Sequence, residues 1–405
     1  MEAPDFLPCG RPYVTDEDVD AVVHVLKSGW LTNGPAVRQF EKTLTETFQC
    51  EHAVSCASGT AALHLALLGL DLKPTDTAIV PTLTFLATAN AARYVGANVI
   101  FTDVDPDTGL MRPEDFEAAL GRAADLSPRI VMPVDFAGQV VDVAAINDIA
   151  ARHSIEVIED SSHAAGTWFE VNGKPFPVGA CPQSRAATLS FHPVKTITAG
   201  EGGAVLTNDA AMARKVALVR NHAMSRDAAT FAFPSEAFEI GHRPKPWYYE
   251  MQTLGFNYRL SDINAALAAS QLRRLNSIVA KQQELIAAYR ERIADAGLDI
   301  RMLTQVPGCR PGWHLCIVLI DFASFKTTRA QVMSELKQAG IGTQVHYLPL
   351  HRQPYYRSFA AGTAFPGADS YYERALSLPL FPGMELKDVD RVVDALTAIL
   401  KGRQG

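Results

Sequence analysis

The chain has 405 residues, of which 48% are hydrophobic and 20% are charged, as is typical of a globular protein that buries a sizeable core. Its 37 lysines and arginines against 44 aspartates and glutamates give a net charge of −7. This acidic balance argues against nucleic acid as the main partner, because nucleic-acid-binding proteins present a basic face. We also expect no membrane association, since the most apolar stretch, residues 53–70, is interrupted by polar side chains.

The first residues and the cysteines point to the cytoplasm. Residues 1–8 contain Glu2 and Asp5 but no basic residue, which is not the pattern of a secretory signal peptide. The 6 cysteines are scattered along the chain and form no Cys-x-x-Cys pair. We therefore expect reduced thiols in a cytoplasmic protein, with neither a disulfide framework nor a metal site.

A helix is predicted near the start of the chain. Thr15 is a suitable N-cap residue, and the acidic Asp16, Glu17 and Asp18 favour the positive end of the helix dipole. Gly29 follows the helical run and is expected to end it.

Short apolar runs then alternate with helical stretches such as residues 61–70 and 144–153. The runs lie at residues 53–56, 78–80, 99–103, 130–134, 157–160, 187–191 and 204–207. This alternation predicts an α/β fold with a doubly wound, mostly parallel sheet. In such a sheet, ligands bind beyond the carboxyl ends of the strands.

The later part of the chain has a different texture. Residues 167–174 predict a hairpin around an Asn-Gly turn, and residues 231–249, rich in proline and aromatic side chains, predict a long loop. A long helix with a break is expected over residues 262–298, followed by mixed strands and helices. We therefore place a large domain at residues 1–259 and a smaller C-terminal α/β domain at residues 260–405.

Two groups of residues at predicted strand ends could bind an ionic ligand. The segment Ser58, Gly59, Thr60 and Ala61 lies between a strand and a helix, where backbone N–H groups can hold an anion. A simple tight turn explains this segment equally well. Asp160 ends the run at 157–160 and could pair with a cationic ring nitrogen or cap the next turn.

Two further residues follow strands in the same way. Lys195 lies between a buried run and the glycine-rich turn at residues 200–203, and a desolvated lysine has a depressed pKa that suits Schiff-base chemistry. Most lysines, however, are solvated surface charges. Phe85 could belong to the core or could stack on a planar ligand.

Together the four features supply what pyridoxal 5′-phosphate (PLP) requires. An amine can join the cofactor covalently, a carboxylate can keep its ring nitrogen protonated, an anion site can hold its phosphate, and an aromatic ring can cover its face. All four follow predicted strands, so they are expected on the ligand-binding edge of the sheet.

The motifs resemble those of the DegT/DnrJ/EryC1/StrS sugar aminotransferase family over nearly the whole chain. They are LTNGP at 31–35, SGTAAL at 58–63, ED at 159–160, SFHPVK at 190–195, GEGG at 200–203 and GFNYR at 255–259. The resemblance implies a PLP-dependent transferase of fold type I, like aspartate aminotransferase. It also implies Lys195 as the lysine joined to the cofactor and Asp160 as the partner of the ring nitrogen.

The same resemblance assigns the other cofactor contacts. Phe85 would stack on the ring, while Thr60, Ala61 and Ser190 would bind the phosphate. Asn257 would reach the cofactor site of the neighbouring subunit, so a homodimer with shared active sites is implied. The full set of cofactor contacts comprises Ser58, Gly59, Thr60, Ala61, Phe85, Asp160, His163, Ser190, Lys195 and Asn257. His163 departs from the family, in which many members carry glutamine at that position.

Other motifs resemble a subgroup that aminates UDP-4-keto-6-deoxy-N-acetylhexosamines in pseudaminic acid biosynthesis. These are DSSHA at 160–164, HPVK at 192–195, WYYE at 247–250 and QVHY at 344–347. This resemblance implies sugar-nucleotide contacts from Trp30, Leu31, Thr32, Asn257, Gln344, Val345, His346 and Tyr347. A packed loop histidine at position 346 and a dimer-interface patch at 247–249 are the alternatives.

Transamination of such a sugar with glutamate as the amino donor is therefore the expected activity. Sugar dehydration is a rival, but relatives with that activity carry histidine in place of the lysine, so Lys195 argues against it. A non-catalytic regulatory protein would often have lost Lys195 or Asp160. The nucleotide (UDP, GDP or dTDP) and amination at C4 rather than C3 rest on the subgroup resemblance alone.

Overall fold

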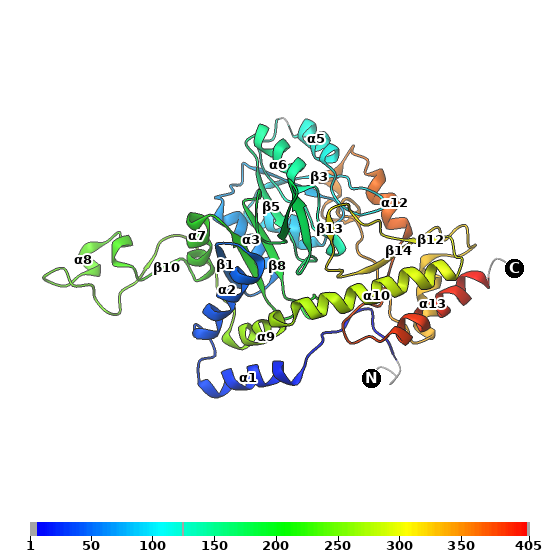
Figure 1. Cartoon of the computed structure of the whole chain (residues 1–405). Helices are drawn as coiled ribbons and strands as arrows, with labels where there is room; N and C mark the ends of the chain where they lie inside the picture. The colour runs from blue at the N-terminus through cyan, green and yellow to red at the C-terminus, as the bar shows by residue number, and fades with distance from the viewer. Residues whose placement is uncertain (1–5, 124, 403–405) are drawn as a thin grey trace.

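A central sheet organises the computed structural model, which describes residues 6–123 and 125–402 (Figure 1). Its seven strands run in the order β1-β9-β8-β5-β4-β2-β3, and β9 alone is antiparallel to its neighbours. The strands are β1 (His52–Cys56), β2 (Thr77–Pro81), β3 (Asn98–Thr102), β4 (Pro128–Val131), β5 (Glu156–Asp160), β8 (Ala186–Ser190) and β9 (Gly203–Thr207). The predicted mostly parallel α/β sheet is confirmed.

One strand differs from its prediction. We expected a strand at residues 130–134, but β4 ends at Val131. Pro133 has no backbone N–H to donate to a neighbouring strand, so regular pairing stops before it. Beyond β4, the Met132 amide still donates a 2.8 Å hydrogen bond to the Ile79 carbonyl of β2, and an isolated bridge between Val134 and Asp160 continues the contact with β5.

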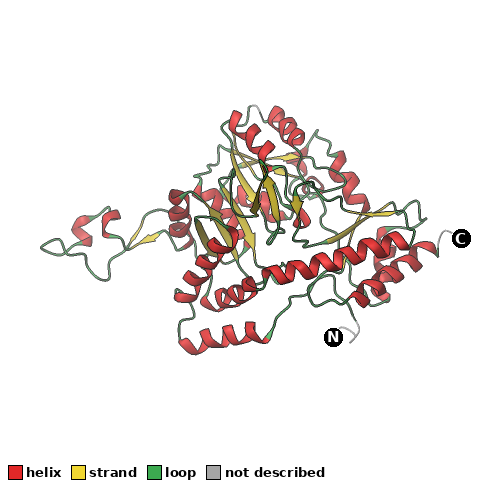
Figure 2. Ribbon diagram, in the orientation of Figure 1, coloured by secondary structure: helices red, strands yellow, loops and turns green. Residues whose placement is uncertain are grey.

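Helices cover the sheet and lie outside its strands (Figure 2). The helices between the strands of the central sheet, and the one after its last strand, are α3 (Gly59–Gly69), α4 (Leu86–Tyr94), α5 (Pro113–Arg122), α6 (Val143–Arg152) and α7 (Ala210–Arg220). The α3 helix carries apolar side chains on most of its surface, which lets it be buried against α4, α7, β8 and β9. Side-chain oxygens of Ser58, Asp142 and Asp209 cap α3, α6 and α7, respectively.

The N-terminal helix is confirmed as α1 (Asp16–Ser28). The Asp18 carboxylate accepts a 3.0 Å hydrogen bond from the Thr15 amide, and Gly29 ends the helix with a φ of 76°. Helix α2 (Pro35–Phe48) follows, and both helices contact α9 (Asp262–Arg273) (Figure 1).

The predicted break in the long helix is real. Helix α9 ends at Arg273, and α10 (Leu275–Asp295) begins two residues later. The hairpin is also confirmed, as β6 (Trp168–Val171) and β7 (Lys174–Pro177) joined by left-handed Asn172 and Gly173. Strand β13 (Cys309–Arg310) adds to the β6 edge of this hairpin.

The C-terminal part is built on a second, antiparallel sheet of β12 (Ile300–Met302), β14 (Cys316–Ile320) and β15 (Ala375–Leu378). Helices α10, α11 (Arg329–Gln338) and α13 (Leu386–Lys401) surround a core on one side of this sheet. Val318 of β14 belongs to that core, while its neighbours Ile317 and Leu319 belong to the core of the central sheet. The domain boundary between residues 259 and 260 stays a prediction.

The predicted loop at 231–249 is part of a projecting arm, the segment 224–252, which extends away from the body (Figure 1). It contains β10 (Met224–Ser225), η2 (Ala228–Thr230), α8 (Pro234–Ala237) and β11 (Glu250–Met251). The Glu250 carboxylate organises it by accepting hydrogen bonds from the Ala232 amide (2.6 Å), the Phe233 amide (3.0 Å) and the Tyr248 hydroxyl (2.9 Å).

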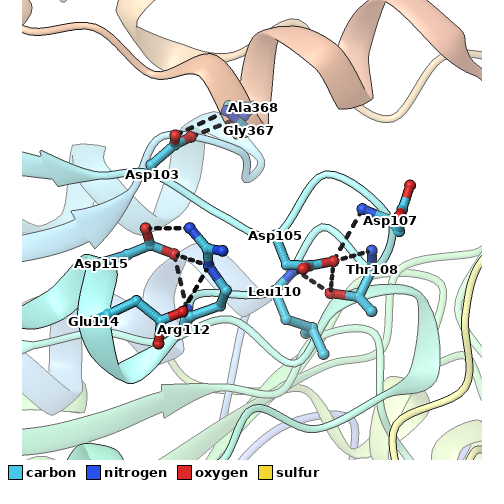
Figure 3. A network of polar contacts seen from close by, with 10 residues as sticks. All are labelled: Asp103, Asp105, Asp107, Thr108, Leu110, Arg112, Glu114, Asp115, Gly367 and Ala368. Carbon is cyan, nitrogen blue, oxygen red and sulfur yellow. Dashed lines mark hydrogen bonds and ion pairs between the residues drawn. The ribbon is translucent and has the colours of Figure 1, made fainter.

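Helix α12 (Pro366–Arg374) contacts both the end of β3 and the segment 344–347. The short helices η3 (Leu350–Arg352) and η4 (Arg357–Ala360) lie between that segment and α12 in the chain. The Asp103 carboxylate accepts 2.8 Å hydrogen bonds from the Gly367 and Ala368 amides at the start of α12 (Figure 3). From the same helix, the Tyr371 hydroxyl donates a 2.9 Å hydrogen bond to the His346 carbonyl. Asp103 therefore anchors the helix that holds the 344–347 segment.

Two expectations concern the chain as a whole. All 6 cysteines are free thiols. Over residues 6–123 and 125–402, the longest helices are too short or too polar for a membrane crossing.

Candidate active site

A cavity of about 570 Å³ lies beyond the carboxyl ends of β1, β2, β5 and β8, as expected for this type of sheet. The four sequence features all contribute to it. Of the predicted site residues, those lining the cavity are Ser58, Gly59, Thr60, Phe85, Asp160, His163, Ser190, Lys195 and Tyr347.

Lys195 enters the cavity from the turn after β8. Its backbone amide donates a 2.9 Å hydrogen bond to the His192 carbonyl, which closes the turn. Desolvation in the cavity lowers the pKa of Lys195 to about 8, against the opposing attraction of Asp160. Within the described residues the side-chain amine has no hydrogen bond or ion pair, so it is free to react.

Asp160 is only 4% exposed, and its two oxygens are held by side chains that the sequence reasoning missed. Oδ2 accepts a 2.7 Å hydrogen bond from the Thr88 hydroxyl of α4. Oδ1 accepts hydrogen bonds from the Ser162 amide (3.2 Å) and hydroxyl (2.6 Å). The Asp-x-Ser spacing is a signal for the Ser162 contact, whereas the Thr88 contact arises only in the folded chain.

The start of α3 forms a narrow cradle. The amides of Gly59 and Thr60 lie in the first helical turn, where N–H groups lack intrahelical partners. A side chain at Gly59 would place its Cβ 2.7 Å from the Ser190 Cβ, so only glycine fits beside that hydroxyl. The Ala61 amide, by contrast, already donates to the Ser58 hydroxyl at 3.1 Å. This cradle fits a phosphate group.

His163 leaves one polar atom unused. Its Nε2 is 3.0 Å from the Tyr347 hydroxyl, while its buried Nδ1 has no hydrogen-bond partner within the described part of the chain. Burial, together with the positive charge of Lys195, places the pKa of His163 far below its usual value. The ring is therefore neutral and can hydrogen-bond a polar ligand atom through Nδ1. His314, which the sequence reasoning missed, lies 4.7 Å away between ring centroids.

Two aromatic side chains from distant segments complete the wall. The Phe85 ring is 52% exposed and lies 5.8 Å from that of Tyr347, between centroids. Burial raises the pKa of the Tyr347 hydroxyl, which stays protonated at neutral pH. Because the half-exposed Phe85 ring lines the cavity, it is available to contact a planar ligand bound there.

Several predicted residues lie outside the cavity lining. The backbone amide of Ala61 is already bonded to the Ser58 hydroxyl. Asn257 is exposed, and it forms an isolated β-bridge with Asn221. The others away from the lining are Trp30, Leu31, Thr32, Gln344, Val345 and His346. Their contacts to a ligand, from this subunit or a neighbour, stay predictions.

Two of these segments are nevertheless held firmly. The Asp262 carboxylate accepts hydrogen bonds from the amides of Gly34 (2.7 Å) and Ala36 (2.9 Å), which fixes the loop after residues 30–32. His346 Nδ1 lies 2.8 Å from the Ser377 hydroxyl, and burial lowers the pKa of His346 to about 4.

Two buried acids lie beneath the site. The Ser161 hydroxyl, next to Asp160 in the chain, donates a 2.6 Å hydrogen bond to Asp135. Burial, together with the charge of Glu159, raises the pKa of Asp135 well above its usual value. Burial also raises the pKa of Glu159 to about 7. Asp135 carried no sequence signal.

The site fits PLP on the chemistry of its donors. The cradle at α3 suits a phosphate, Asp160 suits a protonated ring nitrogen, and the unpartnered Nδ1 of His163 suits a polar ring substituent.

Comparisons with known proteins agree with this fit. The model of the DegT/DnrJ/EryC1/StrS aminotransferase family matches residues 12–397. Among solved structures, Helicobacter pylori PseC, an aminotransferase of pseudaminic acid biosynthesis, is 27% identical with a TM-score of 0.85, over 98% of this chain and 100% of that one. S. venezuelae DesV is 30% identical, with a TM-score of 0.81 and 95% of each chain covered.

A third structure carries the cofactor. Spr1654 from Streptococcus pneumoniae in its PLP form is 26% identical with a TM-score of 0.84, over 98% of this chain and 99% of that one. These likenesses extend over the whole fold, including both the central sheet and the C-terminal part. The chain is therefore a PLP-dependent aminotransferase that belongs to the DegT/DnrJ/EryC1/StrS aminotransferase family.

Proposed function

We propose that this protein is a cytoplasmic sugar aminotransferase that transfers the amino group of L-glutamate to C4 of a nucleotide-linked 4-keto-6-deoxy sugar. The observation that carries the proposal is that the unpaired amine of Lys195 and the buried carboxylate of Asp160 line one cavity. The family match and the sugar aminotransferase relatives support the substrate class.

Lys195 and Asp160 have distinct roles in this proposal. Lys195 would join PLP covalently, and Asp160 would hold the proton of the ring nitrogen. Bound PLP supplies an electron sink that makes a C–H bond next to the amino group acidic. Three hydrogen bonds from Thr88 and Ser162 orient the Asp160 carboxylate and disperse its charge.

Lys195 would also move the proton. With a pKa of about 8, about a tenth of its amine is unprotonated at pH 7, far more than for a solvated lysine. Once the amino group of glutamate has displaced it from the cofactor, the amine can take a proton from the α-carbon of the donor and, in the second half of the reaction, deliver a proton to C4 of the sugar. This role argues against dehydration, because relatives with that activity carry histidine instead of an amine base.

The remaining predicted contacts divide between phosphate, ring and sugar. Gly59, Thr60 and Ser190 would hold the phosphate, Phe85 would stack on the ring, and His163 would contact a ring substituent. The sugar nucleotide would contact Tyr347 and the segments 30–32 and 344–346.

The substrate we favour is UDP-2-acetamido-2,6-dideoxy-hexos-4-ulose, in a pathway of the pseudaminic acid type. The motifs around His163, Lys195 and Tyr347 and the likeness to PseC support it. Amination at C3, or of a GDP- or dTDP-linked keto sugar, is the alternative.

The active unit in this proposal is a homodimer. Asn257 is exposed and outside the cavity of its own chain, as a residue that serves a neighbour's site would be. The projecting arm exposes Phe233, Ile240, Trp247 and Tyr249, large apolar side chains that a second subunit can cover.

Mass spectrometry of the products from UDP-, GDP- and dTDP-linked keto sugars with glutamate tests the function. The wild type should convert a UDP-linked 4-keto sugar to the 4-amino sugar. Lys195→Ala should abolish amine transfer and covalent cofactor attachment, while the exposed Lys174→Ala serves as control. Amine transfer at wild-type rate by Lys195→Ala would refute the assignment.

A further inference from the structure

The loop that follows β4 carries a buried acid that the proposed roles do not use. Asp135 and Ser161 are both fully buried, and the Ser161 hydroxyl donates a 2.6 Å hydrogen bond to Oδ2 of Asp135. The Val141 amide makes a longer contact of 3.4 Å with the other oxygen, Oδ1. The shorter bond shows that the carboxyl group of Asp135 is held mainly by Ser161.

Backbone hydrogen bonds join the same loop to the end of β5. The Asp135 amide donates to the Asp160 carbonyl at 3.0 Å, and the Asp160 amide donates to the Pro133 carbonyl at 2.9 Å. The Ser161 amide donates to the Thr188 carbonyl of β8 at 3.0 Å. The backbone of residues 160 and 161 is thus tied on both sides, and the Ser161 hydroxyl adds a side-chain tie to the β4 loop.

This tie acts on the cavity from behind. Asp160 and Ser162 line the cavity, whereas Ser161 and Asp135 do not. Oδ1 of Asp160 accepts its hydrogen bonds from the amide and hydroxyl of Ser162, so the direction of the carboxylate depends on the backbone of residues 160–162. Fixing Ser161, the residue in the middle of that turn, therefore fixes the carboxylate.

The residue after Asp135 supports another part of the site. Phe136 is buried, and its ring centroid lies 5.6 Å from that of His163 and 6.3 Å from that of Tyr347. The loop after β4 thus contacts both the segment that carries Asp160 and the hydrogen-bonded pair of His163 and Tyr347. A shift of this loop would disturb both.

The charge of Asp135 matters because it lies near the Asp160 carboxylate. Burial, followed by the charge of Glu159, raises the pKa of Asp135 well above its usual value, and the charge of Asp160 adds to this effect. The titratable groups around Asp135 are Glu159 and Asp160 of β5 and the thiol of Cys309 in β13. Asp135 is therefore a neutral carboxyl group at neutral pH, which accepts the Ser161 bond without adding a second negative charge near Asp160.

We propose that Asp135 is a positioning residue of the PLP site, which acts through Ser161 to hold the Asp160 carboxylate toward the ring nitrogen. The inference rests on the role of Asp160 in the proposed function, but not on which sugar is aminated. It requires a neutral hydrogen-bond acceptor at position 135 rather than a charge. Asparagine should therefore replace the acid, whereas alanine should not.

Equilibrium titration of the cofactor-free variants with PLP, followed by absorbance, tests the proposal. Ser161→Ala and Asp135→Ala should each weaken PLP binding about fivefold, the effect of losing one orienting hydrogen bond. Asp135→Asn should bind PLP like the wild type. The matched control is Ser184→Ala, which removes the hydroxyl bonded to the neighbouring buried Glu159. It should lower stability in urea denaturation without changing PLP affinity.

The absorbance of the bound cofactor gives a second readout, which a purely structural role would not move. A protonated ring nitrogen disfavours another positive charge on the nitrogen that joins Lys195 to the cofactor. If the Asp160 carboxylate is misdirected, the ring holds its proton less firmly. The pH at which the absorbance changes should therefore rise in Ser161→Ala and Asp135→Ala, and should stay at the wild-type value in Ser184→Ala.

Unchanged PLP affinity and absorbance midpoint in Ser161→Ala would overturn the inference, even if Asp135→Ala fails to fold. PLP binding by Asp135→Asn that is about fivefold weaker would overturn it as well, because an acceptor would then not suffice. Asp160→Ala separates these results from a failure of the proposed function. If Asp160→Ala loses PLP affinity while Ser161→Ala keeps it, only the inference fails. If Asp160→Ala binds PLP like the wild type, the proposed role of Asp160 fails and the inference fails with it.

Discussion

The hydroxyl of Thr88 donates a 2.7 Å hydrogen bond to Oδ2 of Asp160, so the first turns of α4 and the end of β5 meet at the carboxylate. The same hydroxyl is 2.8 Å from that of Thr84, and both threonines are buried. Thr88 thereby orients the acid on which the cofactor's ring nitrogen depends in our proposal.

Thr88→Val tests that relationship. Valine keeps the shape of threonine but removes the donor, which leaves one oxygen of a buried carboxylate without its partner. Since hydrogen bonds to charged groups contribute about 1.5–3 kcal/mol, we expect PLP affinity and kcat to fall by about tenfold or more. Equilibrium titration with PLP and steady-state kinetics measure this, and Thr43→Val on the surface of α2 is the control. Unchanged kcat and PLP affinity would rule out an orienting role for Thr88.

The pKa of Lys195 predicts how cofactor attachment depends on pH. Only the unprotonated amine can attack the cofactor's aldehyde, and desolvation has lowered the pKa of Lys195 to about 8. The rate of covalent attachment to the cofactor-free protein should therefore rise with pH and level off above about 8. Stopped-flow absorbance between pH 6 and 10 measures this rate.

Asp160→Asn provides the second half of the same test. The Asp160 charge raises the pKa of Lys195 against the effect of desolvation. Removing that charge should shift the midpoint of the attachment profile to lower pH, even if the final complex is weaker. A midpoint near 10, or a shift to higher pH in the variant, would contradict the proposed electrostatics.

Much of this architecture is predictable from local sequence. The apolar runs identify the strands, and the rule that ligands bind at carboxyl ends is enough to bring Ser58, Asp160 and Lys195 to one edge of the sheet. The hairpin at Asn172 is equally local, because an Asn-Gly pair accommodates the left-handed turn.

Other parts depend on contacts between distant segments. Thr88 is 72 residues from Asp160, and Tyr347 is 184 residues from His163, so no spacing rule links either pair. The projecting arm is similar, because its turns form around the carboxylate of Glu250 rather than around a periodic pattern. Such pairings become visible only when the chain is folded.

The variant Asp103→Ala tests whether α12 holds the 344–347 segment at the active site. The Asp103 carboxylate caps α12 through two amides (Figure 3). From α12, the Tyr371 hydroxyl then holds the His346 carbonyl next to Tyr347. Asp103→Ala should lower the free energy of unfolding by about 1–2 kcal/mol, as the loss of a helix cap does. It should also raise the KM for the keto sugar severalfold, because Tyr347 loses its support. Urea denaturation and kinetics measure both effects.

Asp299→Ala, at an exposed position near β12, is the control for Asp103. If Asp103→Ala lowers the free energy of unfolding but keeps the wild-type KM, the predicted effect of the helix cap on the active site is wrong. In that case α12 would stabilise the fold without positioning Tyr347.

Glu159 should make the stability of the protein depend on pH. Burial raises its pKa from 4.5 to about 7, and one of its oxygens has no hydrogen-bond partner within the described residues. Between these two pH values the carboxyl is protonated in the folded chain but ionised in the unfolded chain. Unfolding therefore releases a proton, and a rise in pH favours unfolding.

Glu159→Gln removes this ionisation while keeping an acceptor for the Ser184 hydroxyl, which bonds Glu159 in the wild type. We expect the variant to match the wild type near pH 5 and to be more stable by about 2 kcal/mol at pH 8, as judged by urea denaturation at each pH. Glu170→Gln, at an exposed position of β6, should show no such trend. A stability difference for Glu159→Gln that stays constant from pH 5 to pH 8 would mean that this buried acid is ionised in the folded protein throughout.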